Sequence, residues 1–208
     1  MVNNGSYRYF RDTVLPTVGI QKRNDRRLHR DERSRNAFRQ GAADTVNQLK
    51  NHPCICYWTI FNEGWGQFDA EKATKALRAL DPTRLVDEAS GWFDRGGGDV
   101  HSIHNYFYPL RIRPKARTVA LSEYGGIAWP MPGHEPPRKT YGYGTVRSRA
   151  ELTGRYRDLQ LKTILPQLGR GLSALVYTQL TDVEDEVNGL FTYDPVSYTH
   201  LRAHETRH

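Results

Sequence analysis

The feature that most constrains the fold is the nearly continuous apolar run NHPCICYWTIFNE, which ends in Asn62-Glu63 and is followed by Gly64. Runs of this kind form strands that are covered on both faces, as in parallel sheets. A carboxylate at the end of such a strand has no charged partner nearby in sequence, and burying an unpaired charge is costly or raises its pKa. The run therefore predicts a buried strand between Pro53 and Gly64, and it indicates a functional role for Glu63.

The two cysteines of the chain, Cys54 and Cys56, lie in this same run. We expect them to share one face of the strand as small core residues, too close in sequence for a stabilising disulfide.

The same kind of segment recurs along the chain. Strands are expected at residues 84–92, 99–107, 118–126 and 172–183. One helix is expected to end at residues 44–50. A second is expected at 69–82, with Asp69 as N-cap and Pro82 as its stop, and a third at 150–169, with Pro166 kinking or ending it.

Polar or aromatic residues follow each expected strand at its carboxyl end. Catalytic groups gather at that end of the strands in (β/α) barrels. Five strands are fewer than eight, so the pattern is that of an α/β protein with either an open doubly wound sheet or the second half of a barrel.

The composition of the 208 residues, 38% hydrophobic and 25% charged, is that of one soluble globular domain. No apolar run approaches the roughly 18 to 20 residues of a membrane helix, and the start MVNNGSYRYF lacks the apolar core of a signal peptide. We expect no membrane partner. Localisation stays open, because the native N-terminus is expected to be missing, and the oligomeric state is open as well.

The net charge of +7 comes almost entirely from residues 1–40, which hold ten basic and four acidic residues. Residues 21–38 mix both signs and have almost no aromatic side chains for stacking on bases, which favours a solvated surface loop over a nucleic-acid-binding arm. A basic nucleic-acid-binding module remains the alternative outside sugar chemistry.

Two of the expected strands end in a glutamate, Glu63 and Glu123. Hydrolysis of a glycosidic bond with retention needs two carboxyl groups roughly 5 to 5.5 Å apart, one acting as acid and the other as nucleophile. Neighbouring strand ends of a barrel can supply that separation.

Several separated blocks then resemble, in order, the catalytic domain of glycoside hydrolase family 2, which includes β-galactosidases, β-glucuronidases and β-mannosidases. The blocks are NHPCICYWTIFNEGWGQF, LDPTRLVDEASGWF, DVHSIHNYF, LSEYGG and GLSALVYTQLTDVEDEVNGLFTYD. The resemblance implies a partial (β/α)8 TIM barrel over residues 1–195, carrying approximately strands 4 to 8, with residues 1–50 as a variable, Arg-rich opening segment. Residues 196–208 read like a translated library adapter, so we expect a non-native tail there.

By the same resemblance, Glu63 is the acid/base and Glu123 the nucleophile. Asn62 would donate to a sugar hydroxyl, and Tyr106 would donate to Glu123. Apolar and aromatic neighbours of Glu63 would help it to hold its proton.

Each of three further residues has two possible roles. His104 is either a substrate contact or a hydrogen-bonded structural histidine, and it faces away from His101. Trp65 and Trp92 either stack on a sugar ring or belong to the core or rim.

The acidic segment TDVEDEVNG lacks the spacing of a calcium loop, so we assign no metal and no cofactor. The function implied is a retaining exo-β-glycosidase that hydrolyses terminal β-linked sugars of an oligosaccharide or glycoside, with galactose, glucuronic acid and mannose all open. The alternative is a catalytically inactive fragment or carbohydrate-binding remnant.

Overall fold

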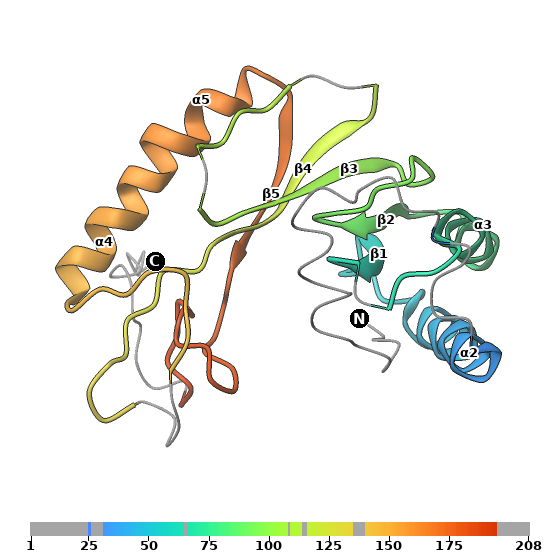
Figure 1. Ribbon diagram of the computed structural model, residues 1–208, viewed down its shortest axis with the longest axis horizontal. Coiled ribbons are helices and arrows are strands. Elements are labelled where there is room, and N and C mark those ends of the chain that lie inside the picture. The colour runs from blue at the N-terminus through green and yellow to red at the C-terminus, as the bar shows by residue number, and fades with distance from the viewer. Residues whose placement is uncertain are drawn as a thin grey trace, which may run out of the picture. The chain divides into compact units, whose positions relative to one another are not determined.

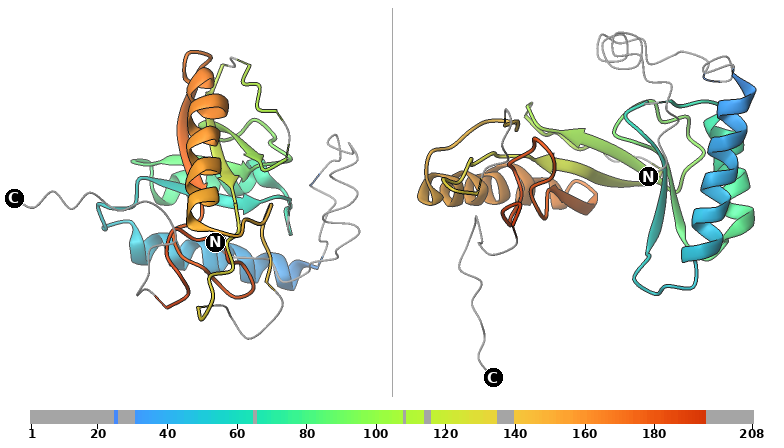
Figure 2. Two further views of the ribbon diagram at one scale, coloured as in Figure 1. Left: turned by 90° about the vertical axis from the view of Figure 1, so that its left-hand side faces the viewer. Right: turned by 90° about the horizontal axis from the view of Figure 1, so that it is seen from below.

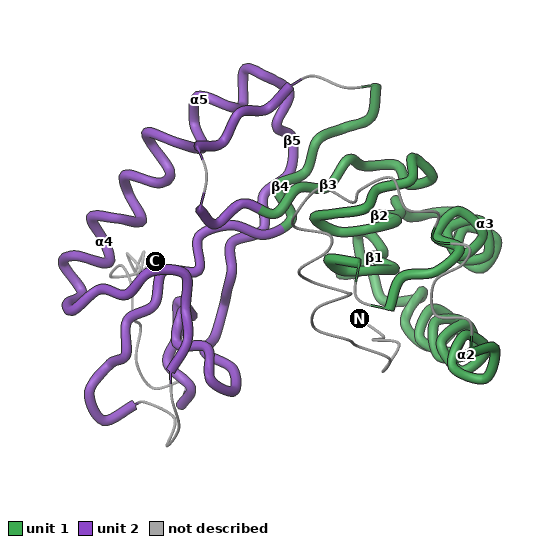
Figure 3. Tube along the Cα trace, viewed as in Figure 1, with its two compact units in different colours: residues 1–104, 115–122 green, residues 105–114, 123–208 purple. Residues whose placement is uncertain are grey.

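A computed structural model describes Asp25 and residues 31–64, 66–107, 109–113, 116–134 and 140–194 (Figure 1). The chain divides into two compact units, residues 1–104 with 115–122 and residues 105–114 with 123–208 (Figure 3). Trp65, the expected tail at 196–208 and nearly all of the segment before residue 31 lie outside the described residues.

The first unit is built on parallel strands. β1 (Tyr57–Asn62) pairs in parallel with β2 (Leu85–Ser90), in a register that sets Asn62 opposite Ser90. Helices α2 (Glu32–Leu49) and α3 (Ala70–Leu80) lie side by side, and α3 packs on both strands (Figures 1 and 2). The buried side chains between them form one apolar cluster, which includes Phe38, Val46, Trp58, Ile60, Phe61, Phe68, Leu77 and Val86.

The apolar run is thus confirmed as a strand, but the strand begins only at Tyr57. Cys54 and Cys56 precede it and are exposed, so the expectation that they are core residues is wrong. The prediction extended the strand to Pro53 because it used hydropathy alone. The chain instead makes turns there, and the Ile55 N–H donates to the His52 carbonyl.

The expectation of a surface loop at residues 21–38 is also wrong from residue 32 onward, where α2 begins. Asp31 is its N-cap and accepts hydrogen bonds from the N–H groups of Arg33 and Ser34. Arg35 is buried, with its guanidinium 4.0 Å from the Asp69 carboxylate and over the ring of Phe68. These contacts come from other elements, and charge patterning along the segment does not reveal them.

Helix α3 has the predicted extent, and Asp69 occupies the N-cap position, but the Asp69 side chain makes no capping hydrogen bond. The Asp25 carboxylate accepts from the Ala70 N–H at 3.1 Å instead. The cap is therefore supplied from 45 residues upstream, by a residue that is itself buried.

Two further strands complete the first unit and lead out of it. β3 (Val100–Asn105) and β4 (Thr118–Gly125) lie where strands were expected, and the described residues that connect β2, β3 and β4 form no helix. β4 enters the second unit at Glu123.

In the second unit, β5 (Leu172–Thr178) follows a long helical run. The run consists of α4 (Arg149–Asp158), a π-helical segment η3 (Leu159–Ile164) and α5 (Leu165–Leu168). Pro166 lies in the first turn of α5, directly after the change from π-helix to α-helix, at the predicted irregularity. Gly126 donates its N–H to the Thr178 carbonyl just beyond the end of β4.

The described strands form a two-stranded sheet, β1–β2, and a three-stranded sheet, β3–β4–β5, rather than a closed barrel. The α/β class is confirmed. None of the described helices is long and apolar enough to cross a membrane.

A buried carboxyl group lies inside the first unit. Asp87 of β2 is 1% exposed, and its Oδ2 accepts a hydrogen bond from the Ser102 hydroxyl at 2.7 Å. Burial raises the pKa of Asp87 to about 6, although the hydrogen bond from Ser102 lowers it. The group therefore holds its proton more tightly in the folded chain than in the unfolded one.

We expect this group to make the stability of the chain depend on pH. Because the folded-state pKa lies above the unfolded value of about 4, the folded state binds more protons between about pH 4 and 6, and stability falls as the pH rises through this range, by up to roughly 3 kcal/mol. Asp87→Asn removes the titration while keeping an oxygen acceptor for Ser102. Urea unfolding at several pH values should show a flatter profile for Asp87→Asn than for the wild type. The exposed-site control Asp44→Asn should keep the wild-type slope, and identical profiles for Asp87→Asn and the wild type would contradict the assignment.

Large apolar side chains are exposed on the helical run of the second unit. Leu161, Leu165 and Leu168 are 55%, 55% and 47% exposed and follow one another at helical spacing. Such a patch favours association.

We expect the 208-residue chain to self-associate through this patch. Because burying one leucine contributes about 1.5 to 3 kcal/mol, the double variant Leu161→Gln/Leu165→Gln should weaken association at least about tenfold. Sedimentation equilibrium measures the change, with Lys162→Gln as the control on the same helical turn. A wild-type chain that stays monomeric at high concentration would refute the expectation.

Candidate functional site

Glu63 follows the last residue of β1 in a strained backbone conformation. Its φ is 51°, in the left-handed region that residues other than glycine rarely adopt, and its N–H donates to the Ser90 carbonyl at 2.9 Å. Gly64 continues the turn with φ 73°, and a Cβ there would lie 2.5 Å from the Phe93 ring. Strain of this kind costs about 1 to 3 kcal/mol and is concentrated at functional sites.

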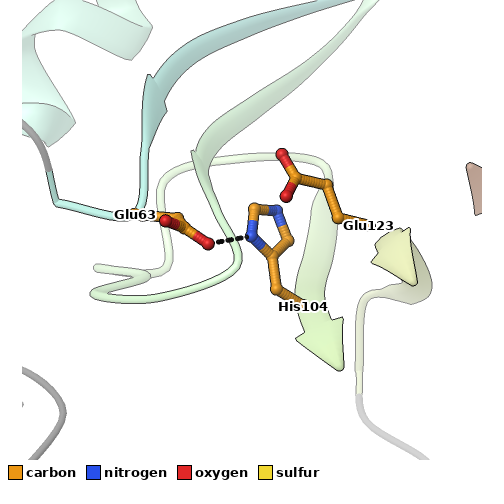
Figure 4. Close-up of side chains that lie close together, drawn as sticks. All are labelled: Glu63, His104 and Glu123. Atoms are coloured by element: carbon orange, nitrogen blue, oxygen red, sulfur yellow. Dashed lines mark hydrogen bonds and ion pairs between the residues drawn. The ribbon is translucent and has the colours of Figure 1, made fainter. Parts of the chain in front are cut away.

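The Glu63 carboxylate is held by His104 of β3. Oε1 lies 2.7 Å from His104 Nδ1 (Figure 4). The other ring nitrogen, Nε2, lies 2.9 Å from Ser90 Oγ. The His104 side chain is 1% exposed, whereas that of Glu63 is 17% exposed. The imidazole thus lies behind the carboxylate, in the arrangement of the hydrogen-bonded histidine that the sequence left open.

His101, on the same strand, has a different partner, as its spacing predicts. Its Nδ1 lies 3.0 Å from Asp94 Oδ2, and Arg117 binds the same carboxylate. Burial alone would raise the pKa of Asp94, but the hydrogen bonds from His101 and Arg117 hold it well below the usual range. This ion pair joins the loop after β2 to the start of β4 and is structural.

Asn62 ends β1, immediately before Glu63. Its Oδ1 is buried and has no hydrogen-bond partner among the described residues. A buried acceptor without a partner is unfavourable, so this amide is suited to a hydroxyl group that a ligand would bring.

Trp92 is half-buried, with its ring centroid 6.5 Å from that of His104. Trp92 therefore lies beside the ring that binds Glu63.

In the second unit, Glu123 is bound by the tyrosine that the sequence singled out. Tyr106 donates its hydroxyl to Glu123 Oε2 at 2.6 Å, and the same hydroxyl lies 3.1 Å from Thr178 Oγ1. Burial, with the neighbouring carboxylate, raises the Tyr106 pKa well above its usual value, so the phenol keeps its proton. The predicted hydrogen bond from Tyr106 to Glu123 is confirmed.

The ring of Tyr106 is held in place by stacking. Tyr143 lies parallel to it, with centroids 3.7 Å apart and an interplanar angle of 5°. A Cβ at Gly126 would meet both rings, so the chain needs glycine there.

Sequence reasoning missed several residues that support these carboxylates: Ser90, Ser122, Tyr143 and Thr178. Two of them carried a weak signal, since Ser122 directly precedes Glu123 and Ser90 lies near the end of the strand expected at residues 84–92. Tyr143 lies between two glycines in no strand or helix, and only the tertiary fold brings it to Tyr106.

The acids of TDVEDEVNG that contact neighbouring groups brace their own loop. Asp182 Oδ1 accepts from the Gly189 N–H at 2.8 Å, and Glu186 Oε2 accepts from Asn188 Nδ2 at 3.1 Å and Gln179 Nε2 at 3.3 Å. These bonds give the two carboxylates a structural role.

The sequence of the chain is similar to those of known proteins. Residues 12–110 match the family model described as "Glycosyl hydrolases family 2, TIM barrel domain". A β-galactosidase of Klebsiella pneumoniae is 28% identical over 104 residues, which are 49% of this chain and 10% of that protein.

Two solved structures have a similar fold. A β-glucuronidase from an uncultured Clostridium sp. matches with a TM-score of 0.53 and 17% identity, over 77% of this chain and 33% of that one. The β-galacturonidase of Eisenbergiella tayi, solved with galacturonate and described as GH2, matches with a TM-score of 0.52 and 16% identity, over 77% and 35%. The chain thus spans about a third of the solved structures and a tenth of the curated relative. It is similar to the TIM barrel catalytic domain of glycosyl hydrolases family 2, whose members are glycoside hydrolases.

Proposed function

We propose that this chain carries the catalytic carboxylates of a retaining exo-β-glycosidase that hydrolyses terminal β-linked sugars by double displacement, and that its strands correspond approximately to strands 4 to 8 of a (β/α)8 barrel. The observation that carries the proposal is the pair of glutamates at strand ends, each with one specific partner: Glu63 with His104 and Glu123 with Tyr106. The mechanism requires the two carboxyl groups to lie about 5 to 5.5 Å apart in the working enzyme.

Glu63 takes the role of acid/base. Its carboxyl group is partly exposed while its partner ring is buried, so the outer oxygen is accessible to a leaving-group oxygen. As acid, Glu63 protonates the leaving oxygen; as base, it then takes a proton from the incoming water.

Glu123 takes the role of nucleophile. A hydroxyl that donates to a carboxylate stabilises its ionised form, which is the form that attacks the anomeric carbon. Tyr106 provides this bond to Oε2 of Glu123.

Asn62 would contact the sugar hydroxyl next to the anomeric carbon, because its buried oxygen lacks a partner among the described residues. Such a contact strengthens as the oxocarbenium-like transition state forms. Trp92 is a candidate for stacking on the ring.

A basic nucleic-acid-binding module is not favoured. Within the described part of the basic segment, Arg35 is buried and Arg39 contacts Glu32 and the Phe68 ring. An inactive, carbohydrate-binding remnant predicts binding without turnover, and the assays below separate it from the enzyme.

We expect Glu63→Gln and Glu123→Gln each to lower kcat/KM by several orders of magnitude, because each removes a group that changes its bonding in the transition state. Nitrophenyl β-galactoside, β-glucuronide and β-mannoside are the substrates, assayed with the 208-residue chain and with the full gene product that contains it. The exposed isosteric control Glu184→Gln should retain wild-type rates. Turnover that survives either active-site change would contradict the catalytic role of that glutamate, and an absence of turnover with all three sugars would argue for the remnant.

Retention and the identity of the nucleophile can be tested together. A 2-deoxy-2-fluoroglycoside with a good leaving group should form a glycosyl ester on Glu123, because the fluorine slows both displacements while the good leaving group keeps the first one faster than the second. Mass spectrometry of the peptide that contains Glu123 should show the added sugar, and NMR should show the β-anomer as the first product. An α-anomer formed first, or a label on another residue, would contradict the assignment.

A further inference from the structure

A continuous line of buried polar side chains leads from His104 into the first unit. It passes from Ser90 at the end of β2 to Ser122 of β4, then to Ser102 of β3. It ends at Asp87 of β2. Ser90 Oγ lies 2.9 Å from Ser122 Oγ, Ser122 Oγ lies 2.6 Å from Ser102 Oγ, and Ser102 Oγ lies 2.7 Å from Asp87 Oδ2.

All of these side chains belong to residues of the first unit that are buried or have a buried ring. Ser90, Ser102 and Ser122 are 4%, 3% and 5% exposed, and Asp87 is 1% exposed. With the contacts of His104 to Ser90 and Glu63, the line joins a buried carboxyl group to the proposed acid/base through four intervening side chains.

The direction of each hydrogen bond follows from the ionisation of Asp87, because a serine hydroxyl has one proton to donate. When Asp87 is ionised, Ser102 donates to it. Ser122 then donates to Ser102, and Ser90 donates to Ser122. The Ser90 oxygen is left to accept from His104 Nε2–H, so Nδ1 of the neutral ring can accept a hydrogen bond from protonated Glu63.

When Asp87 is protonated on Oδ2, the directions along the line can reverse, although the Ser122 hydroxyl also lies 3.4 Å from the Ile103 carbonyl. Asp87 donates to Ser102, the hydroxyls turn toward His104, and Ser90 donates to Nε2. The ring proton is then on Nδ1, where it donates to an ionised Glu63. The hydroxyls rotate and the imidazole changes tautomer, while the carboxyl groups gain or lose their protons to solvent.

We propose that the Ser90–Ser122–Ser102 line couples the tautomer of His104 to the buried carboxyl of Asp87, so that Asp87 is a positioning residue for the acid/base Glu63. This inference rests on the proposed function only for the role of Glu63; the coupling itself does not.

The charged and titratable groups around Asp87 in this unit are Tyr57 from β1, His104 from β3, Asp94 after β2 and Arg117 before β4. Asp94 and Arg117 pair with each other, and the tyrosine stays protonated because burial raises its pKa. Asp87, whose pKa burial raises to about 6, therefore changes charge near neutral pH at the end of the line opposite His104.

Gly91 shows that the position of the His104 ring is tightly specified. A Cβ at this residue would lie 2.5 Å from His104 Cγ and 2.6 Å from Nδ1, and Gly91 has φ 84°. The ring has room only because residue 91 is glycine, so its two nitrogens are held against Ser90 and Glu63.

The test is ¹⁵N NMR of the histidine-labelled 208-residue chain, with His104 assigned through His104→Gln. The ring nitrogens report which of them carries the proton. In the wild type at pH 8 we expect the proton on Nε2, with a shift toward Nδ1 as the pH falls through about 6. Ser122→Ala should abolish this shift because it removes the middle hydroxyl, and Asp87→Asn should abolish it because the end group no longer titrates.

Two controls separate coupling from loss of structure. His101 should keep its signal in both variants, since it pairs with Asp94 outside the line. Thr74→Val removes another buried hydroxyl of this unit, which donates to the Ala70 carbonyl, and should leave the His104 course unchanged. If Ser122→Ala loses the His101 signal, Ser102→Ala replaces it. The proposal would be overturned if the position of the His104 ring proton depended on pH in the same way in the wild type, in a folded serine variant (Ser122→Ala or Ser102→Ala) and in Asp87→Asn.

An activity arm connects the coupling to Glu63. In the gene product that hydrolyses a glycoside, Ser122→Ala should move the basic limb of the kcat/KM profile to lower pH by about one unit, with KM nearly unchanged, since one hydrogen bond is worth about 1 kcal/mol. An unmoved limb would refute the positioning role. An NMR shift that occurs in a protein without any hydrolysis would refute the proposed function and leave the coupling intact.

Discussion

The hydrogen bond between Glu63 and His104 is the interaction on which the site in the first unit depends. It joins the end of β1 to β3 at 2.7 Å and holds a carboxylate that the backbone presents from a left-handed conformation. Left-handed strain of about 1 to 3 kcal/mol persists only where the surroundings over-determine it. Here the Ser90 carbonyl fixes the Glu63 N–H, and His104 fixes its carboxylate, so both ends of the residue are held. If β1 continued in extended conformation through residue 63, the Glu63 side chain would point in another direction.

The polar line behind His104 would be a poor way to stabilise a core. Buried hydroxyls and carboxyls gain stability only when every one of them is paired, and apolar side chains of similar size would often do as well. Serine is the smallest side chain that can both accept and donate, so three of them can stand in line between packed strands at 2.6 to 2.9 Å. Each of these hydroxyls can donate toward either end of the line. The directions of the hydrogen bonds can therefore change together, which separate hydrogen bonds could not do.

The sequence predicted the elements that depend on local information and failed where distant residues decide. The apolar runs placed all five described strands, and helix propensity with Pro82 placed α3. The strand pattern also placed Glu63 and Glu123 at strand ends, and the family resemblance indicated the bond from Tyr106. The sequence did not predict that Arg35 is buried or that Asp25 caps α3, because the partners that make their burial favourable lie on other elements. The serine line was equally invisible, because it is assembled from three strands.

The two glutamates differ in the chemistry of their partners, and this difference supports the roles proposed for them. Tyr106 keeps its proton, so it can only donate to Glu123, and a carboxylate that accepts such a bond is stabilised in its ionised form. His104 has no such restriction, because its Nδ1 can accept from a protonated Glu63 or donate to an ionised one. A nucleophile needs one fixed state, whereas an acid/base must pass through both states in each turnover. A phenol beside one carboxyl and an imidazole beside the other meet these two needs, and exchanging the partners would meet neither.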